Sequence, residues 1–343
     1  MNNKLAYFIS KSSMFGLGYF LLCNLNNKNS YISIILGTII GIIIIYLYSK
    51  ISKYSNHNIH KYLNNYFMGK IYNIILYLFY LYIIIITILT ITTFISSFYL
   101  IKTPKLIIII PILLISLYLT FKEKQVLINL GNLAFYFSLF IVILFTILLI
   151  PYSKINELLP LFNYNSLNII HGALIYASIS SIPLILVNNY DTNFKSTLKN
   201  YLIASLISLT IVVGTTLSLG NNLLNVYRFP EYAVLKQIKI LDFIENIENI
   251  SAFGWYSESF MVISLTLANI KDTLPTKFNK LLVVISIIIF MIPVMIFGNN
   301  YELLLKLFYV HPYILLLFLL IFLSLLIYLK KNNIANKHNI SYN

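Results

Sequence analysis

Residues 168–187 read NIIHGALIYASISSIPLILV, and this stretch decides how the rest of the chain is interpreted. The segment is apolar enough to cross a bilayer, and as a helix it would span about 30 Å, the thickness of a hydrocarbon core. Pro183 donates no backbone hydrogen bond and clashes one turn back, so carbonyl groups near Ile179 lose their partners. Because lipid cannot replace those partners, we expect this backbone to face protein or a wet cavity. Broken helices of this kind form midplane binding sites in secondary transporters, although an ordinary proline kink explains the same pattern.

The composition is that of a polytopic membrane protein. The chain has 343 residues, of which 59% are hydrophobic and only 10% are charged, and its mean hydropathy is +0.85. Apolar segments of membrane length fill almost the whole chain, so 1–343 is expected to be a single membrane domain. The only cysteine, Cys23, excludes an internal disulfide framework and a cysteine-rich metal site. We therefore expect neither a metal nor another cofactor.

Ten segments are candidates for membrane spans. They cover residues 6–23, 31–49, 71–101, 106–121, 126–150, 168–187, 200–219, 249–270, 281–297 and 309–329. If the N-terminus is cytoplasmic, the inner segments carry fifteen Lys or Arg and three Asp or Glu, whereas the outer segments carry eight and six. The positive-inside rule then predicts an all-α membrane protein of about ten helices with both termini inside, N-in and C-in. Topology thus explains the net charge of +14, which does not indicate a nucleic-acid partner.

The two halves of the chain begin alike. The first span contains SKSSMFGLG at 10–18. Its small and polar residues make it a poor membrane helix, as those of the sixth span do. Small residues in one span are explained by close helix packing, but here two such spans each begin a group of five predicted membrane spans. We predict a five-plus-five inverted repeat, with 1–160 as the first repeat, 161–330 as the second and 331–343 as a cytoplasmic tail.

Hydroxyl side chains gather at the end of the third span. They are Thr87, Thr90, Thr92, Thr93, Ser96 and Ser97. They can line a polar path, but they can equally donate to carbonyl groups of their own helix. In the preceding loop, His57 and His60 have no carboxylate nearby, which favours a solvated loop over a metal site.

Two ionisable residues lie inside predicted spans. Glu258 is the only carboxylate there and Lys11 the only cation. A buried ionisable group in a membrane is a functional candidate by default. The two side chains can pair, or Lys11 can extend to the interface while Glu258 is protonated or bonded to water. Between spans seven and eight, PEYAVLKQIKI at 230–240 predicts a helix that lies on the protein or the interface.

The segment 226–270 carries a resemblance to a known family. Pro230 precedes an apolar helix, and a segment with the spacing I…F-x-E-x-x-E leads into a span with a central tryptophan and phenylalanine. The matching residues are Pro230, Ile240, Phe243, Glu245, Glu248, Trp255 and Phe260, with Gly37, Gly41, Met68, Gly69, Lys70, Lys102, Thr103 and Pro104 in the first half. In this pattern the chain resembles the spore germination permease family, the B subunits of germinant receptors, over nearly its whole length.

The resemblance implies a LeuT-like fold of the amino acid/polyamine/organocation superfamily. It further implies a small amino-acid-like germinant held between spans one, three, six and eight, and germinant receptor A and C subunits as partners in the inner spore membrane. The ligand-binding residues expected from helix breaks and resemblance are Gly16, Leu17, Gly18, Thr90, Thr93, Tyr176, Ser178, Ser180, Ser181, Trp255 and Glu258. The free N–H groups of the broken helices would bind the carboxylate of the ligand. Glu258 would bind its ammonium group.

Three departures from the family pattern keep alternatives open. Cys23-Asn24 stands where relatives have a proline, Asn246 where they have an arginine, and the serines of 178–181 replace an acidic centre. A free-standing cation-coupled amino-acid transporter is one alternative, and a structural receptor subunit with a degenerate pocket is another. A membrane acyltransferase, the enzyme alternative, is disfavoured because His171 has no acidic or nucleophilic neighbour in the sequence.

Overall fold

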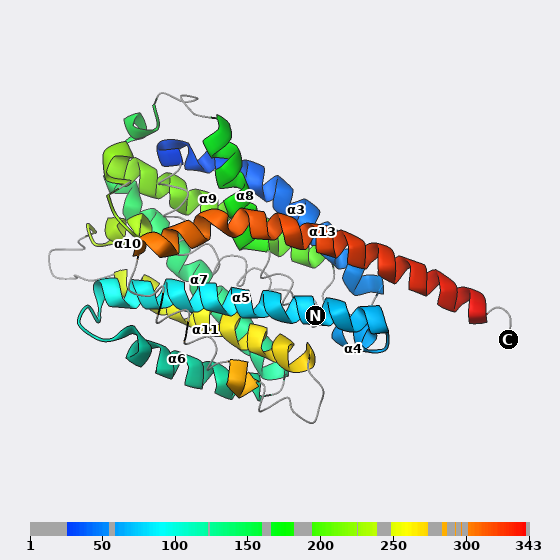
Figure 1. Ribbon diagram of the computed structural model, residues 1–343. Coiled ribbons are helices and arrows are strands. Elements are labelled where there is room, and N and C mark those ends of the chain that lie inside the picture. Colours follow the sequence, from blue (N-terminus) through cyan, green and yellow to red (C-terminus); the bar gives the residue numbers. More distant parts are fainter. Residues whose placement is uncertain are drawn as a thin grey trace.

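The computed structural model of the chain is a bundle of helices (Figure 1). It describes residues 26–54, 59–122, 124–159, 166–181, 194–224, 226–238, 248–273, 283–286, 292, 296 and 301–340. The longer helices are α3 (Ser30–Tyr54), α5 (Phe67–Phe98), α6 (Lys105–Thr120), α7 (Lys124–Leu149), α8 (Ser166–Ser181), α9 (Phe194–Leu224), α11 (Glu248–Thr273) and α13 (Tyr301–Ile340). The short ones are η1 (Asn27–Asn29), α4 (Ile59–Asn64), η2 (Ile150–Tyr152), η3 (Ile155–Leu158) and α10 (Pro230–Leu235).

Five of the described helices are long and apolar enough to cross a membrane. They are Ser30–Tyr54, Phe67–Phe98, Gln125–Tyr152, Phe194–Leu224 and Tyr309–Lys331, and Lys105–Thr120 is a shorter apolar helix. These six match six of the ten predicted spans. The predicted span 6–23, most of 281–297 and the residues around Pro183 lie outside the described residues. The multi-pass, all-helical character is therefore confirmed, while the count of ten stays a prediction.

Helix α11 occupies the interior of the bundle. It packs against α5, α6 and α7, and most of its residues are buried, among them Trp255 and Glu258. A helix surrounded by other helices need not be strongly apolar, because its polar groups contact protein rather than lipid. This explains how the eighth predicted span tolerates several serines and a carboxylate.

Helices α3 and α8 approach each other closely because two glycines, Gly37 and Gly172, face their contact. A β-carbon at Gly37 would lie 2.6 Å from the carbonyl oxygen of Ala173, and one at Gly172 would overlap the side chain of Asn26. The Asn26 side chain donates to Ser33 Oγ (2.8 Å), and the Ser33 hydroxyl in turn donates to the carbonyl oxygen of Ile169 (3.0 Å). Small residues allow backbones to approach in this way where lipid supplies no hydrophobic drive between helices.

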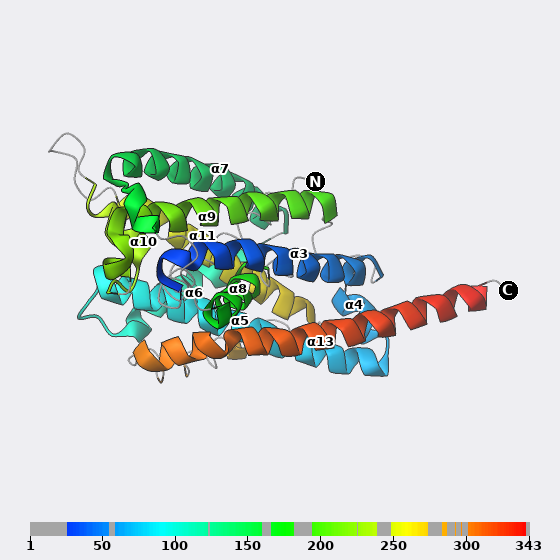
Figure 2. The ribbon, with the colours of Figure 1, turned by 90° about the horizontal axis from the view of Figure 1, so that it is seen from above.

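Helix α8 also touches α13, and α3 also touches α9. In Figure 2, α8 is seen nearly end-on between α3 and α13, which run across the view. Gly41, one turn beyond Gly37, faces the hydroxyl group of Tyr201 on α9. One surface of α3 therefore sets the position of two helices from the second half of the chain.

The loop histidine His60 corrects the expectation of a solvated loop. It is buried on α4, where Nδ1 lies 2.7 Å from Asn73 Oδ1 and Nε2 lies 3.1 Å from Tyr80 OH. Both partners belong to α5, so the side chain joins α4 to α5. The prediction was wrong because residue spacing does not show that α4 folds back onto the bundle. His57 lies outside the described residues.

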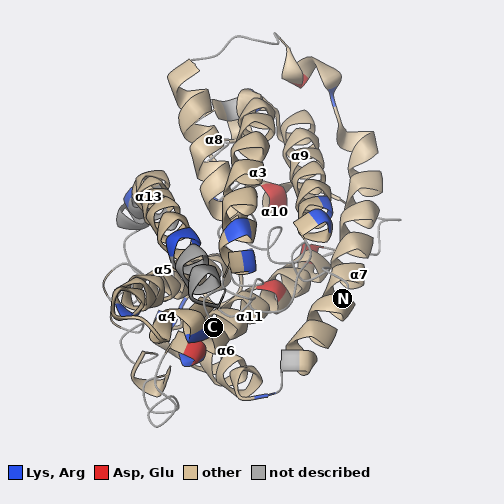
Figure 3. Cartoon of the chain, turned by 90° about the vertical axis from the view of Figure 1, so that its right-hand side faces the viewer, with Lys and Arg blue, Asp and Glu red and all other residues tan. Residues whose placement is uncertain are grey.

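Basic side chains collect at the end of the bundle near the C-terminal half of α13. Figure 3 looks at this end and shows lysines on α3, α4, α9 and α13. These helices carry Lys50, Lys53, Lys61, Lys195, Lys199, Lys330 and Lys331, all assigned by the sequence to the inner side. Their shared position agrees with the predicted orientation, in which this end faces the cytoplasm.

The contact at Gly41 can be tested by adding one methyl group. Gly41→Ala should lower the apparent melting temperature, because its β-carbon would overlap the buried Tyr201 and overpacking costs about 1–3 kcal/mol. The matched control is Gly214→Ala, where the nearest atom lies 3.6 Å from the added carbon. Equal melting curves for the two purified variants would show that the contact is unimportant.

Candidate functional site

The serines of α8 are buried and hydrogen-bonded within their own helix. Ser178 donates to the carbonyl oxygen of Ile175 (2.7 Å), Ser180 to that of Tyr176 (2.7 Å), and Ser181 to that of Ala177. Ser180 Oγ also lies 3.2 Å from Tyr201 OH on α9. Tyr176 itself is buried against Gly37 of α3. These hydroxyls thus stabilise α8 and its contacts, and each oxygen keeps the ability to accept a further hydrogen bond.

The threonines predicted to line the site behave in the same way. Thr90 donates to the carbonyl oxygen of Ile86 (2.8 Å) and Thr93 to that of Leu89 (2.7 Å), both on α5. Three further residues of the predicted pocket, Gly16, Leu17 and Gly18, lie outside the described residues. That the first span meets α8 and α5 at one ligand stays a prediction.

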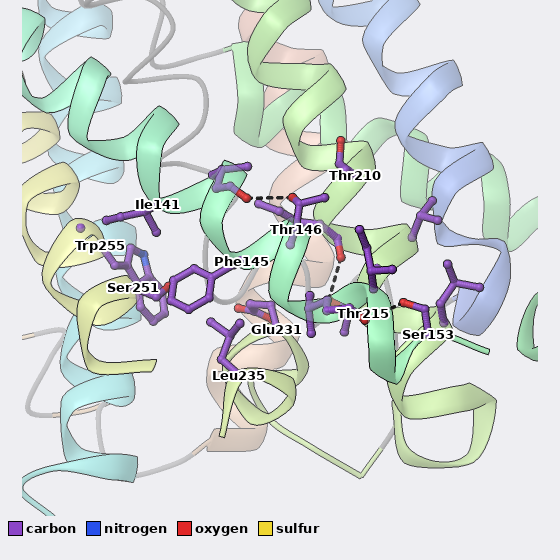
Figure 4. Close-up of a pocket in the computed structure, with 18 residues that line it drawn as sticks. Ile141, Phe145, Thr146, Ser153, Thr210, Thr215, Glu231, Leu235, Ser251 and Trp255 are labelled. Atoms are coloured by element: carbon purple, nitrogen blue, oxygen red, sulfur yellow. Dashed lines mark hydrogen bonds between the residues drawn. The ribbon is translucent and has the colours of Figure 1, made fainter. Parts of the chain in front are cut away.

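A cavity of about 220 Å³ lies between α7, α9, α10 and α11 (Figure 4). We call it the α10 cavity. It is lined by Ile141, Val142, Phe145, Thr146, Leu149, Ile150, Ser153, Thr210, Ile211, Val213, Gly214, Thr215, Leu217, Glu231, Leu235, Ser251, Gly254 and Trp255. An engineered cavity of ~150 Å³ already holds a benzene molecule, so this volume suits a small ligand.

Most of the described cavity wall is apolar. Among the described residues that line it, Glu231 alone has an ionisable side chain, and it is only 6% exposed. The hydroxyls of Thr146, Thr210 and Thr215 donate to carbonyl groups of their own helices. A carboxylate in such surroundings attracts a cationic group more strongly than it would in water.

Helix α10 places Glu231 in the cavity. It begins at Pro230, which suits the first position of a helix because its missing N–H needs no partner there. All six of its residues are buried, as the prediction of a helix lying on the protein requires. The observed helix ends at Leu235, earlier than predicted.

Trp255 joins the cavity to an aromatic cluster at the same end of the bundle. Its ring lies 4.1 Å from that of Phe94 on α5 and 5.8 Å from that of Phe229, measured between centroids. Tyr232 of α10 packs on Phe94 as well, and its hydroxyl lies 2.7 Å from that of Tyr99. Burial, followed by this hydrogen bond, raises the pKa of Tyr232 above its ordinary value, so the phenol stays neutral.

Glu258 lies one helical turn beyond Gly254 on α11, next to the cavity rather than in its wall. It is 1% exposed, and its Oε1 accepts a hydrogen bond from Ser138 on α7 (3.1 Å). Lys11, its predicted partner, is outside the described residues, so the ion pair stays a prediction. Of the predicted site residues, the α10 cavity includes Trp255 alone.

Sequence reasoning missed Glu231 as a site residue. It stands in an outer loop between polar segments, and its spacing indicates only that one face of the helix is apolar. Its burial follows from the way α10 folds between α9 and α11. Among the residues that the structure describes, no group of three His, Cys, Asp or Glu side chains could hold a metal ion.

The hydrogen bond between Ser138 and Glu258 joins two helices beside the cavity. Ser138→Ala should lower stability by about 1–3 kcal/mol, because a buried carboxylate oxygen loses a donor. The control is Thr146→Val, since the Thr146 hydroxyl bonds only to Val142 of its own helix. Thermal unfolding of both variants measures the difference in stability. An equal loss of stability in the two variants would contradict the role given to the Ser138–Glu258 hydrogen bond.

The comparisons with known proteins give the family. A family model described as spore germination protein matches residues 2–302. No curated protein matches the chain. The matched range includes four of the five strongly apolar helices, those from α3 to α9, and the whole of α10 and α11, in agreement with a permease-like membrane protein. The chain belongs to the spore germination protein family of membrane permeases.

Proposed function

We propose that this protein is the membrane subunit of a germinant receptor and that it binds a small amino-acid-like ligand. Two observations support the proposal: the family match over most of the chain, and a small cavity in which one carboxylate faces mostly apolar walls.

The α10 cavity is the proposed ligand site. Glu231 would bind the ammonium group of the ligand, and Ile141, Phe145 and Leu235 would contact its hydrocarbon part. Hydrogen bonds between an ammonium group and a carboxylate are among the strong ones, and exclusion of water strengthens them further. Trp255 forms part of the wall, so the ligand would touch the aromatic cluster between α5, α10 and α11.

The pocket predicted from the sequence remains a second candidate. It would use the first span with Thr90, Thr93, Ser178 and Ser180, and it would place Glu258 at the ammonium group. The hydroxyl oxygens of these side chains can still accept hydrogen bonds although their protons are used within the helices. The two sites share Trp255 of α11, so only variants of other residues can separate them.

The proposal includes the arrangement in the membrane. We propose ten spans in a five-plus-five inverted repeat of the LeuT-like type, with both termini cytoplasmic, in the inner spore membrane. Germinant receptor A and C subunits would be the protein partners. A cation-coupled amino-acid transporter is the competing function, and uptake into proteoliposomes that follows a proton or sodium gradient would favour it. A structural subunit would co-purify with its partners and show no ligand response.

The sequence contains one tryptophan, so intrinsic fluorescence reports on the α10 cavity directly. Titration of the purified protein with amino acids should change Trp255 emission and raise the melting temperature for the recognised ligand. The substitution Glu231→Gln keeps the shape of the side chain but removes its negative charge. It should weaken binding by about 2–3 kcal/mol, which is roughly a thirty- to hundred-and-fiftyfold loss of affinity.

Two controls decide between the sites. Glu157→Gln removes a carboxylate on η3, outside the cavity, and should leave affinity unchanged. Ser180→Ala tests the pocket predicted from the sequence and should also leave it unchanged if the ligand occupies the α10 cavity. Loss of binding in Ser180→Ala together with normal binding in Glu231→Gln would move the ligand to that pocket. A protein that responds to no amino acid would contradict the proposed function.

A further inference from the structure

Three basic side chains meet in an open pocket at the end of the bundle opposite the lysine-rich end. The pocket measures about 640 Å³ and is formed by the end of α5, the turn that follows it, the start of α6 and the segment before α10. We call it the basic pocket. The residues that give it its character are Ser96, Ser97, Phe98, Lys102, Lys105 and Arg228.

The positive charges of the basic pocket are held close together. Lys105 is half-buried and lies near enough to Arg228 for the two charges to repel each other. Lys236 adds a further cation at the edge, with Nζ 4.9 Å from the centroid of the Phe98 ring. None of the described residues that line this pocket is acidic. Like charges at close range destabilise each other, and a bound anion would relieve that repulsion.

An apolar groove of about 520 Å³ adjoins the basic pocket. It lies between α5, α6 and α11 and is lined by residues that include Ile95, Leu100, Ile107, Phe253 and Phe260. Several residues that line the groove are close neighbours in the sequence of residues that line the basic pocket. Ile95 of the groove precedes Ser96 of the pocket, and Ile107 lies two residues after Lys105.

The groove opens toward the face that lipid would cover. Ile107 is 57% exposed, and the exposed residues Ile110 and Leu114 continue the apolar path along α6. No side chain caps the N-terminus of α6 at Pro104, and Pro104 itself lines the pocket. The combination is a cationic pocket at the end of the helix bundle and an apolar groove formed by the adjoining parts of α5 and α6.

We propose that the basic pocket and the apolar groove together bind one anionic phospholipid. The headgroup phosphate would lie between Lys102, Lys105 and Arg228, and an acyl chain would lie in the groove. Basic pockets between transmembrane helices are suited to anionic headgroups, because each cation near the surface adds to the attraction. A free phosphate would use the pocket only, whereas the groove requires a hydrocarbon chain. This site is separate from the α10 cavity and does not depend on the proposed germinant.

The test compares phosphatidylglycerol with phosphatidylcholine and with inorganic phosphate. The full-length protein is purified in detergent and titrated with each, with native mass spectrometry for bound lipid and thermal unfolding for stabilisation. Phosphatidylglycerol should bind and stabilise, and phosphatidylcholine should not. In the Lys105→Gln/Arg228→Gln variant, the affinity for phosphatidylglycerol should fall roughly thirtyfold, and in the exposed Lys102→Gln variant roughly fivefold.

The charge-matched control is Lys154→Gln/Lys306→Gln, which removes two exposed positive charges outside the pocket. It should bind phosphatidylglycerol like the parent protein. Ile107→Trp adds bulk at an exposed groove position and should weaken binding of the lipid but not of inorganic phosphate.

Three results would overturn the proposal. The first is unchanged affinity for phosphatidylglycerol in both pocket variants. The second is equal binding of phosphatidylcholine. The third is stabilisation by inorganic phosphate alone that equals that by the lipid and persists in Ile107→Trp, which would make the occupant a free oxyanion.

Discussion

The close contact between α3 and α8 is the interaction on which the rest of the structure depends. It connects a helix near the start of the described chain to one from its second half, and Gly37 and Gly172 leave no room for a side chain there. Through α8 the contact reaches α13, and through Gly41 it reaches Tyr201 of α9. Since lipid tails are as apolar as the helix surfaces, this fit relies on van der Waals packing and the Asn26–Ser33–Ile169 hydrogen bonds.

Helix α9, placed by that contact, is one wall of the α10 cavity. Helix α10 closes the space between α9 and α11 with six buried residues, and this position brings Glu231 out of a loop and into an apolar interior. A carboxylate in a mostly apolar wall attracts an ammonium group more strongly than it would in water, and this links the packing of α3 to the proposed recognition of a germinant.

The two ends of the bundle differ in charge and in form. One end carries the lysines of α3, α4, α9 and α13, which suits a cytoplasmic face. The other end carries the aromatic cluster around Phe94 and Trp255 and, beside it, the basic pocket with Lys105 and Arg228. Ligand recognition and lipid recognition are thus proposed at the same end, on opposite sides of the C-terminal part of α5 and the start of α11.

The sequence by itself determined the class of protein, the position of most helices and the family. These depend on local properties: apolar length, the distribution of lysines and the order of motifs from Pro230 to Phe260. It did not determine where polar side chains point. The hydroxyls of Thr90, Ser178 and Ser180 donate to carbonyl groups of their own helices, and their place in a ligand pocket stays a prediction. The burial of His60 and of Glu231 was decided only by the tertiary structure, because both lie on short helices whose surroundings come from distant parts of the chain.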